Sequence, residues 1–372
     1  MSNVSLKDQI SSVLQGLSLG SSATIVGLDI GMSGVKVTEL VKISSNSFQL
    51  NNFGFHPLTE GIIIDDQFHQ PDLLKTAIKS AFAQGGIKSK SICYGFPSQN
   101  TVIKKMHAPI GTRQEIEDHI SWEAEQFLPF GADNAAISVY IPEGGEKQKE
   151  GVDVVMVAAK QDLVSNYDTL LKEAGFNVKI IDLQILSLIN VFEISYSEEM
   201  EEYKKGTLLV DFGAQTTKIL VYKEGLPIFT KVLSIGGVNV TEEIQKEIGL
   251  SFEEAEDLKL MRDDKGNTPQ EITTIVMKIA DKIVTQVKES INFYLSSSGQ
   301  DRIFRCMATG GNLQLPGVLE ALAKHTNLSV EIMDPFKKIK IKNKKISSEM
   351  LEQISYVGAV SIGLALRGLM TN

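Results

Sequence analysis

Two stretches of the chain share one pattern of apolar and polar positions. They read ATIVGLDIGMSGVKVTELV near the start and TLLVDFGAQTTKILVYKEG in the middle. In each, a β-branched apolar run leads to an aspartate and a glycine-containing turn, and an alternating apolar run follows. This pattern predicts a strand, a tight turn and a second strand in both places.

The two stretches form an internal repeat. Placing Asp29 on Asp211, an offset of 182 residues, also superposes a glycine two positions later and a lysine seven positions later. The offset is about half of the 372-residue chain. Because a repeat of this size indicates a repeated structural unit, we expect two copies of one domain.

The remaining pattern divides the chain further. Residues 4–17 carry an apolar stripe, which predicts a short amphipathic helix on a tether within 1–22. The polar face of this helix has few charges, so we favour docking on the protein, or disorder, over contact with a membrane. Residues 102–178 read strand, helix, strand, strand, helix, with Thr112 and Glu115 at the spacing of a capping box. We therefore expect this division: 1–22, an N-terminal segment; 23–101 and 179–205, the first domain; 102–178, an inserted small subdomain; 206–346, the second domain with a helical part at about 240–300; 347–372, a helix returning to the first domain.

Composition narrows the class of protein. Apolar residues make up 42% and charged residues 22%, and the net charge is −9, which argues against nucleic acid as a partner. Cys93 and Cys306 lie far apart in apolar runs, which indicates buried reduced thiols, and the five histidines show no metal-site spacing. No apolar run reaches the roughly 18 to 20 residues of a membrane span, so we expect a cytoplasmic chain.

The glycine turn after Asp29 is a candidate phosphate site. Residues 31–34 can point successive backbone N–H groups at an anion, Lys36 can add a positive charge, and Asp29 can orient a magnesium-bound water. One such turn alone is more often an ordinary β-turn. A second turn of the same kind follows Asp211. The pair of turns favours the phosphate site, because two turns that face each other across a domain boundary can clamp the phosphates of one nucleotide.

Two further motifs fit a nucleotide site. In MATGGNLQLPGVLEAL, glycines 310 and 311 follow a buried strand and open a helix, where a backbone free of side chains can approach a nucleoside. Taken alone, this motif is more often an ordinary loop between a strand and a helix. In AEDLK, Glu256 and Lys259 are three residues apart on one helix face and can reach one ligand, although a surface ion pair has the same spacing.

In this order and spacing, the three elements resemble the superfamily of actin, sugar kinases and heat-shock chaperone ATPases. Most of the chain is similar to the PilM family of type IV pilus assembly proteins, through these stretches: GLDIGMSGVKVTEL, WEAEQFLPF, SIGGVNVTEEIQKEIGLSFEEAEDLK, the ATGG turn and GAVSIGLALRGL. The resemblance implies an α/β fold of duplicated actin-like (ribonuclease H-like) ATPase domains, with a small inserted α+β subdomain of the kind found in PilM and FtsA.

The resemblance also implies ATP or ADP with Mg²⁺ as ligands. Asp29 and Asp211 are the expected metal-facing residues, acting through water. The expected nucleotide contacts are Asp29, Gly31, Ser33, Gly34, Lys36, Asp211, Gly213, Ala214, Gln215, Thr216, Glu256, Lys259, Gly310, Gly311 and Asn312.

The chain departs from the superfamily pattern where hydrolysis is concerned. Met32 and Gln215 occupy positions that often carry a hydroxyl residue. Because hydrolysis needs a residue that orients the attacking water, we expect slow or no turnover. The candidates for a catalytic residue are Asp29, Asp182, Gln184 and Asp211.

The implied partner is the N-terminal cytoplasmic tail of PilN, held in a groove between the inserted subdomain and the first domain. The expected groove residues are Phe127, Leu128 and Phe130, whereas Trp122 is expected in the subdomain's own core. Pilus motor ATPases and self-association are further implied contacts, and the inner membrane is reached only through partners. An FtsA-like membrane-associated polymer is the alternative; a sugar or acetate kinase is less favoured, because no motif supplies a catalytic carboxylate in a substrate pocket.

Overall fold

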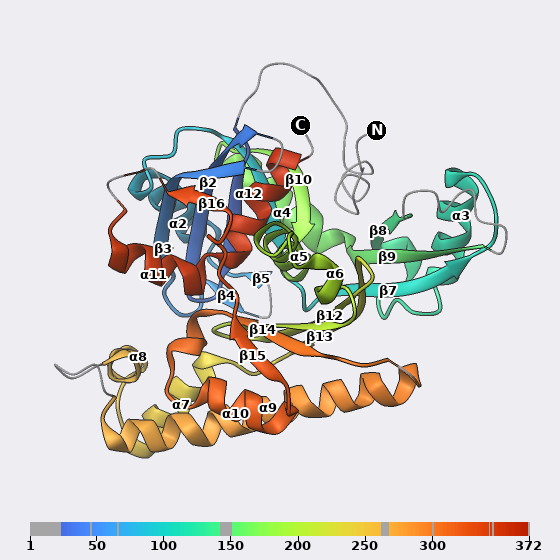
Figure 1. Cartoon of the computed structure of the whole chain (residues 1–372). Helices are drawn as coiled ribbons and strands as arrows, with labels where there is room; N and C mark the ends of the chain where they lie inside the picture. The colour runs from blue at the N-terminus through green and yellow to red at the C-terminus, as the bar shows by residue number, and fades with distance from the viewer. Residues whose placement is uncertain are drawn as a thin grey trace.

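The computed structural model describes residues 24–44, 47–64, 67–141, 151–261, 268–299, 301–341, 343 and 346–370. The segment 1–22, for which the sequence predicts a short helix, lies outside these ranges. Figure 1 shows two large sheets, each with helices against it, and a small module at one end of the molecule.

The first half is built on a six-stranded sheet in the order β10-β6-β1-β2-β3-β16. Its strands are β1 (Val26–Gly31), β2 (Gly34–Ser44), β3 (Ser47–Pro57), β6 (Ser91–Phe96), β10 (Asn177–Leu183) and β16 (Ile339–Ile341). The helices that share its core are α2 (Pro71–Gln84), α4 (Gln161–Glu173), α5 (Gln184–Ser195) and α12 (Ala359–Met370). The short strands β4 (Ile63–Ile64) and β5 (Gln67–Phe68) pair with each other.

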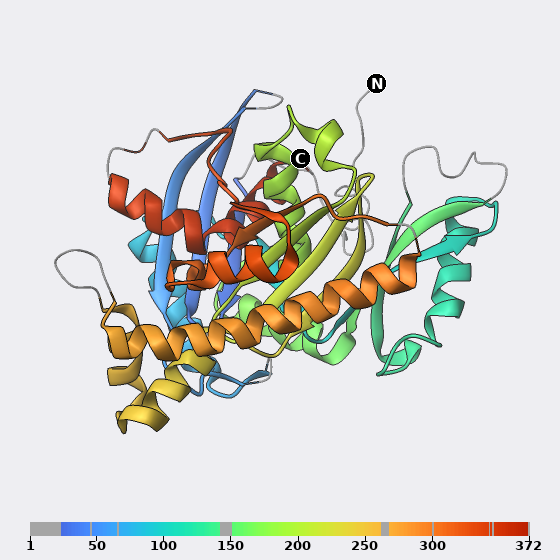
Figure 2. The same ribbon diagram turned by 60° about the horizontal axis from the view of Figure 1, so that its bottom comes forward.

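The second half has a five-stranded sheet in the order β13-β12-β11-β14-β15 and a core of its own. Its strands are β11 (Thr207–Phe212), β12 (Thr217–Lys223), β13 (Leu226–Leu233), β14 (Arg305–Thr309) and β15 (Ser329–Ile332). Its helices are α7 (Gly237–Ile248), α8 (Phe252–Leu260), α9 (Gln270–Ser298) and α10 (Val318–Thr326). Helix α9 runs along this half (Figure 2), because apolar residues at spacings of three and four give it one buried stripe.

The predicted duplication is confirmed by strand pairing. Strand β1 pairs antiparallel with β2 and parallel with β6, and β11 pairs antiparallel with β12 and parallel with β14. Each half therefore presents the same hairpin next to the same parallel neighbour. The short helix α6 (Met200–Tyr203) lies on the connection between the halves.

The inserted module is smaller than the predicted range 102–178. It consists of β7 (Thr101–Ala108), α3 (Arg113–Ala124), β8 (Ala135–Tyr140) and β9 (Val152–Lys160), with the strands in the order β7-β9-β8. The predicted capping box of Thr112 and Glu115 opens α3. Helix α4 and strand β10 belong to the first half instead, because the apolar face of α4 is buried in that half's core.

The chain returns to the first half earlier than the predicted boundary at 346. Strand β16 pairs parallel with β3, so residues 339–341 already lie in the first sheet. Helix α11 (Ser348–Val357) follows, and then the buried helix α12, which approaches β1 so closely that a side chain at Gly27 would meet the Ser361 carbonyl at 2.0 Å. Within the described residues no single helix is long and apolar enough to cross a membrane. Helices α11 and α12 reach that length and apolarity only when taken together, and the pair is bent by 83°.

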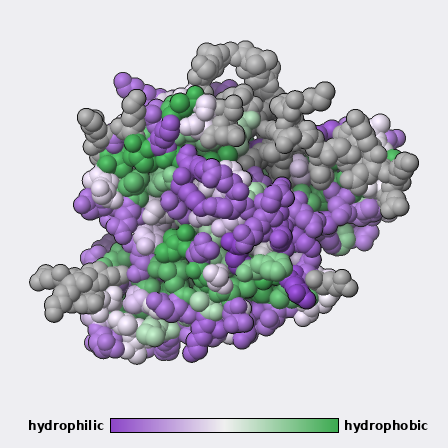
Figure 3. Space-filling view, viewed as in Figure 1, coloured by the Kyte–Doolittle hydropathy of each residue, from purple (hydrophilic) through white to green (hydrophobic). Residues whose placement is uncertain are grey.

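The burial of the two cysteines agrees with the prediction from the sequence. Cys93 and Cys306 are free, fully buried thiols, as predicted. Figure 3 shows apolar side chains gathered in a band over the second sheet, and polar side chains over much of the remaining described surface on that face.

Candidate functional site

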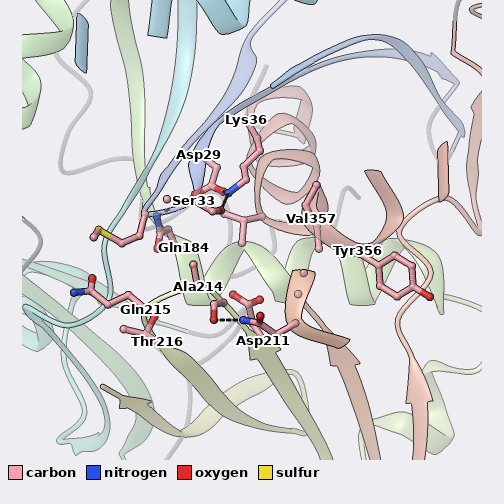
Figure 4. Close-up of a pocket in the computed structure, with 18 of the residues that line it drawn as sticks. Asp29, Ser33, Lys36, Gln184, Asp211, Ala214, Gln215, Thr216, Tyr356 and Val357 are labelled. Atoms are coloured by element: carbon pink, nitrogen blue, oxygen red, sulfur yellow. Dashed lines mark hydrogen bonds and ion pairs between the residues drawn. The ribbon is translucent and has the colours of Figure 1, made fainter. Parts of the chain in front are cut away.

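A cleft of about 660 Å³ lies between the two halves. This volume is in the range of small-ligand sites, which is roughly 300 to 1,000 Å³. Figure 4 shows Asp29, Ser33 and Lys36 of the first half on one side and Asp211 on the other, with Tyr356 and Val357 of α11 beside them. Both halves and the returning C-terminal segment therefore build the cleft.

The first side of the cleft is the turn between β1 and β2. Register places Asp29 directly opposite Lys36, and Lys36 Nζ lies 3.7 Å from Asp29 Oδ2 and 3.3 Å from Ser33 Oγ. From α5, Gln184 Nε2 donates a hydrogen bond to Asp29 Oδ1 at 3.0 Å and another to the Ile30 carbonyl at 3.1 Å. Asp29, Lys36 and Gln184 are all buried, so their polar atoms are held in fixed positions.

The second side repeats this geometry in the turn between β11 and β12. Register again places Asp211 opposite Lys218, and Lys218 Nζ lies 2.9 Å from Asp211 Oδ2. The Gly213 amide donates to the Thr216 carbonyl at 3.0 Å and closes the turn. Two amides at the start of α7 donate to the carbonyls of Gly213 and Ala214, which fixes the turn on that helix.

The charged side chains of the two turns affect one another. Burial raises the pKa of Asp29 above its usual value, the Asp211 carboxylate acts in the same direction, and the ammonium groups of Lys36 and Lys218 oppose both. Two buried carboxylates and two buried ammonium groups thus share one small volume. Such a site is prepared for a ligand that carries its own charges, such as a polyphosphate with a cation.

The third element is the turn after β14. Gly310 has φ 106°, and a Cβ at this position would lie 2.5 Å from the Phe212 carbonyl oxygen and 2.7 Å from Asp211 Oδ1. Its amide donates to the Tyr356 carbonyl on α11. The side-chain amide of Asn312 donates to the carbonyls of Phe212 and Gly213, so this turn is held on the turn between β11 and β12.

Glu256 and Lys259 form a partly buried pair rather than a surface one. Lys259 Nζ lies 2.6 Å from Glu256 Oε2, 3.0 Å from Thr241 Oγ1 and 3.3 Å from the Gly237 carbonyl. Burial lowers the pKa of Lys259. An ammonium group has three N–H donors, so Lys259 can donate to all three acceptors and thereby holds α8 on α7. The same contacts position the half-buried Glu256 at the cleft.

Every predicted nucleotide-contacting residue except Gly34 lines the cleft. Gly34 serves the turn itself, because its φ is 155° and a Cβ there would lie 2.6 Å from the His56 carbonyl oxygen. Among the catalytic candidates, Asp29, Gln184 and Asp211 line the cleft. Asp182 does not line it, because its carboxylate accepts a hydrogen bond from the Leu183 amide and pairs with the buried Arg367.

Sequence reasoning missed two groups of cleft residues. Lys218 was not chosen, although the repeat aligns it with Lys36 and so carried the signal. The α11 residues had no such signal, because nothing in the local sequence places this helix beside the third turn. They are Met350, Gln353, Ile354, Tyr356 and Val357.

The predicted groove residues of the module are divided by burial. Leu128 is buried in the module's core and Phe130 packs against that core. Phe127 is 38% exposed, and Lys104 Nζ lies 2.9 Å from the centroid of its ring. The prediction that Trp122 packs in the core is wrong: its side chain is 70% exposed, because the buried positions 116, 120 and 124 of α3 put residue 122 on the opposite face.

The donor set fits magnesium held mainly by water and phosphate. In the described part of the chain, no group of three or more histidine, cysteine, aspartate or glutamate side chains could hold a metal ion. Asp29 and Asp211 are two carboxylates that line the cleft at the two hairpin turns, and magnesium is commonly bound by one or two carboxylates with several waters and substrate phosphates.

Comparisons with known proteins agree with this geometry. The family model for the type IV pilus assembly protein PilM matches residues 27–369. Among solved structures, a chain of a PilM–PilN type IV pilus biogenesis complex superposes with a TM-score of 0.83 at 23% identity, covering 94% of this chain and 99% of that one. The ethanolamine utilization protein EutJ of Carboxydothermus hydrogenoformans superposes with a TM-score of 0.52 at 14% identity, covering 97% of both chains.

Curated relatives include cell division proteins FtsA. The Pseudomonas aeruginosa protein is 25% identical over 65% of this chain and 62% of its own length, and the Bacillus subtilis protein is 23% identical over 85% of this chain and 80% of its own. The chain spans between 54% and 62% of the length of the first three such relatives. Together with the solved structures, these likenesses support the actin-like ATPase fold.

Adjacent glycines in the third turn provide a matched test of this geometry. Gly310→Ala should destabilise the protein by about 1 to 3 kcal/mol, because the residue would keep a positive φ and its Cβ would meet backbone and carboxylate atoms. Gly311→Ala should cost far less, because its Cβ would meet only Val357 Cγ1 at 3.4 Å. Urea unfolding of both variants measures the difference, and equal losses would contradict the described turn.

Proposed function

The chain belongs to the family of type IV pilus assembly proteins PilM, and on this premise we propose that it is an ATP-binding scaffold of the pilus assembly platform. In this proposal, nucleotide in the cleft sets the angle between the two halves, and the module with the first half receives the cytoplasmic tail of PilN. The observation that carries the proposal is the convergence of two phosphate turns and a third glycine turn on one cleft.

Nucleotide binding is supported by the charges and backbone groups of the cleft. Lys36 and Lys218 lie on the two phosphate turns and can each make a charge-assisted hydrogen bond to a phosphate oxygen. Gly31 and Gly213 keep side chains away from the approach to these turns. The third turn and Glu256 would border the nucleoside, with ATP or ADP as the proposed ligand.

Magnesium is proposed at the phosphates. Asp29 and Asp211 would hold it through water, and the ion would neutralise phosphate charge. The ion pairs with Lys36 and Lys218 keep both carboxylates in place at the turns.

Hydrolysis is proposed to be slow or absent. Gln184 is the side chain best placed to orient water, yet its amide already donates to Asp29 and to the Ile30 carbonyl. Asp182, the other candidate on this segment, is paired with Arg367. Met32 and Gln215 line the cleft without supplying the hydroxyl groups that the superfamily pattern leads us to expect there.

The proposed partner is PilN, by similarity to the chain of the PilM–PilN complex. A disordered tail would bind in an extended form, with apolar side chains in pockets and backbone groups paired. Phe127 and Phe130 offer partly exposed aromatic surface on the module, whereas Leu128 supports them from the core.

The proposed location is the cytoplasmic face of the inner membrane, reached through PilN, with pilus motor ATPases as further partners. An FtsA-like membrane-associated polymer is the second candidate, favoured by the shared fold and the FtsA relatives. A sugar or acetate kinase is less well supported, because the acidic residues that line the cleft are engaged with lysine side chains.

Replacing either phosphate-turn lysine should weaken the binding of magnesium ATP. Lys36→Met and Lys218→Met each remove a charge-assisted contact worth about 1.5 to 3 kcal/mol, or roughly 10- to 150-fold in Kd. Isothermal titration measures the change, and Lys282→Met, an exposed lysine on α9, is the control. If millimolar magnesium ATP leaves the melting temperature and heat signal of the wild type unchanged, the proposed nucleotide site is wrong.

Turnover of ATP by the wild type should fall far below the roughly 10 per second of a median enzyme. The physical reason is that Asp29, Asp211 and Glu256 are each paired with a lysine, and that the side-chain amide of Gln184 already donates two hydrogen bonds. A phosphate-release assay measures the rate. A rate near that of metabolic enzymes would favour the kinase alternative over the scaffold.

A peptide of the PilN cytoplasmic tail should bind the wild type and bind Phe127→Ala and Phe130→Ala more weakly, since each change removes apolar contact surface. A loss of about 1 kcal/mol or more, roughly fivefold in Kd or above, is expected for a contacting aromatic residue. Phe293→Ala is the matched control, because this phenylalanine on α9 is 66% exposed in the other half. Equal affinity in all variants would place the groove elsewhere, and no binding to the wild type would exclude this partner.

A further inference from the structure

A second cavity, of about 640 Å³, lies between the two halves beside the cleft. The two spaces share Gln99, Gln215 and Val232 in their linings. The volume of the second cavity is in the range of small-ligand sites. The proposed nucleotide site uses none of the residues that line this cavity alone, so the cavity is available to a ligand of its own.

Most of the polar lining of this cavity consists of side-chain amides. They belong to Gln67, Gln99, Asn100, Gln215 and Asn239, and we call the space the amide cavity. In the first half, Gln67 lies on β5, and Gln99 and Asn100 lie on the connection from β6 to β7. In the second half, Gln215 lies in the turn between β11 and β12, and Asn239 lies on α7. A ligand in the amide cavity would therefore contact both halves.

Several of these amides have hydrogen-bonding capacity to spare. Within the described part of the chain, the side-chain amides of Gln67 and Gln215 have no hydrogen-bond partner. Figure 4 shows the Gln215 side chain directed away from Asp211, so this amide does not serve the carboxylate of its own turn. Gln99 Nε2 lies 3.5 Å from Ser234 Oγ across the boundary between the halves, which is long for a hydrogen bond. Both halves thus present amides that a ligand can pair with.

The charge of the lining excludes two classes of ligand. Among the described residues that line the amide cavity, Glu242 is the only charged one, whereas three lysines line the cleft. A phosphate or another anion would therefore find no positive partner in the amide cavity. Val232 and Val238 are its only apolar lining residues, which is too little apolar surface for a hydrophobic ligand. The ligand that fits is polar and neutral.

The hydrogen-bonding groups of the lining match hydroxyl groups. A side-chain amide carries both donors and an acceptor, and a hydroxyl group also donates and accepts, so two neighbouring hydroxyl groups can pair with one amide. Glu242 only accepts, and Asn239 Nδ2 holds its carboxylate at 3.2 Å. The lining therefore suits a ligand that donates from several positions, as a sugar or a cyclitol does.

We propose that the amide cavity binds a neutral polyhydroxy compound, which acts as an effector and ties the two halves together. Gln67 and Gln99 hold it from the first half, and Gln215 and Glu242 hold it from the second. No phosphoryl group is transferred to it.

The bound compound also acts on the cleft, and this part of the inference rests on the proposed function. Contacts to both halves favour the angle at which the amide cavity is formed, and at that angle the two phosphate turns share one cleft. The compound should therefore raise the affinity for magnesium ATP, and by linkage ATP should raise the affinity for the compound by the same factor, at least fivefold.

The test is a titration of the full-length protein, without nucleotide, with glucose, galactose, maltose and myo-inositol at millimolar concentration. Saturation-transfer NMR on the resonances of each probe measures binding, and at least one probe should bind the wild type. Gln67→Met and Glu242→Met, one from each half, should each weaken that binding about 2- to 10-fold, because each removes a hydrogen-bond partner of the ligand. Repeating the titration with magnesium ATP measures the coupling.

Two variants with the same chemical changes elsewhere are the controls. Gln126→Met replaces an exposed amide of the module, and Glu289→Met replaces an exposed carboxylate on α9. Neither residue lines the amide cavity, so both variants should bind the probe like the wild type. Melting temperatures of all variants show that they are folded.

Several outcomes would overturn the inference. Failure of every probe to bind excludes the site, as does binding that Gln67→Met and Glu242→Met both leave unchanged. Affinity for the probe that bound ATP leaves unchanged contradicts the coupling. Transfer of a phosphoryl group from ATP to the probe, detected by phosphorus NMR, would make the amide cavity the acceptor site of a kinase instead. Probe binding is measured without nucleotide, so a failure of ATP to bind would refute the proposed function and leave the result on the amide cavity intact.

Discussion

Two aspartates and two lysines are buried at one cleft, and the need to pair these four charges is the strictest constraint on this structure. Each hairpin places an aspartate directly opposite a lysine, so each half brings a balanced pair to the boundary. Buried charges are costly unless they are paired and hydrogen-bonded, and Gln184 and Ser33 supply further polar contacts in the first half. The duplication of the fold thus has a chemical consequence: two copies of a small charged hairpin make one site that neither copy makes alone.

The repeat explains why this part could be predicted from sequence. A hairpin fixes its own register through its turn, so the spacing of seven residues between aspartate and lysine determines that the two face each other. Boundaries of the module and the second half were harder. Apolar spacing shows that α4 has a buried face, but not which core receives that face, and the short strand β16 finds its partner β3 almost 300 residues earlier.

The other wrong or missing predictions concern the direction in which a helix faces and contacts between distant parts of the chain. Trp122 was expected inside because it is aromatic, yet the phase set by Ile116, Ile120 and Ala124 turns it outward, and the sequence already contained that phase. The position of α11 was not contained in any local pattern. It depends on α12 packing against β1 and on the Gly310 amide reaching the Tyr356 carbonyl, two contacts between distant parts of the chain.

The module contacts both halves of the molecule. One face of its sheet, with Val155, Val157 and Ala159, is buried in the large core that joins the strands and helices of the first half to Leu220 and Tyr222 of the second half. Its edge strand β7 lies against β13 of the second half, and the charge of Lys105 on β7 acts on Asp301. Because the module contacts both halves, a change in the angle between the halves must alter at least one of these two sets of contacts.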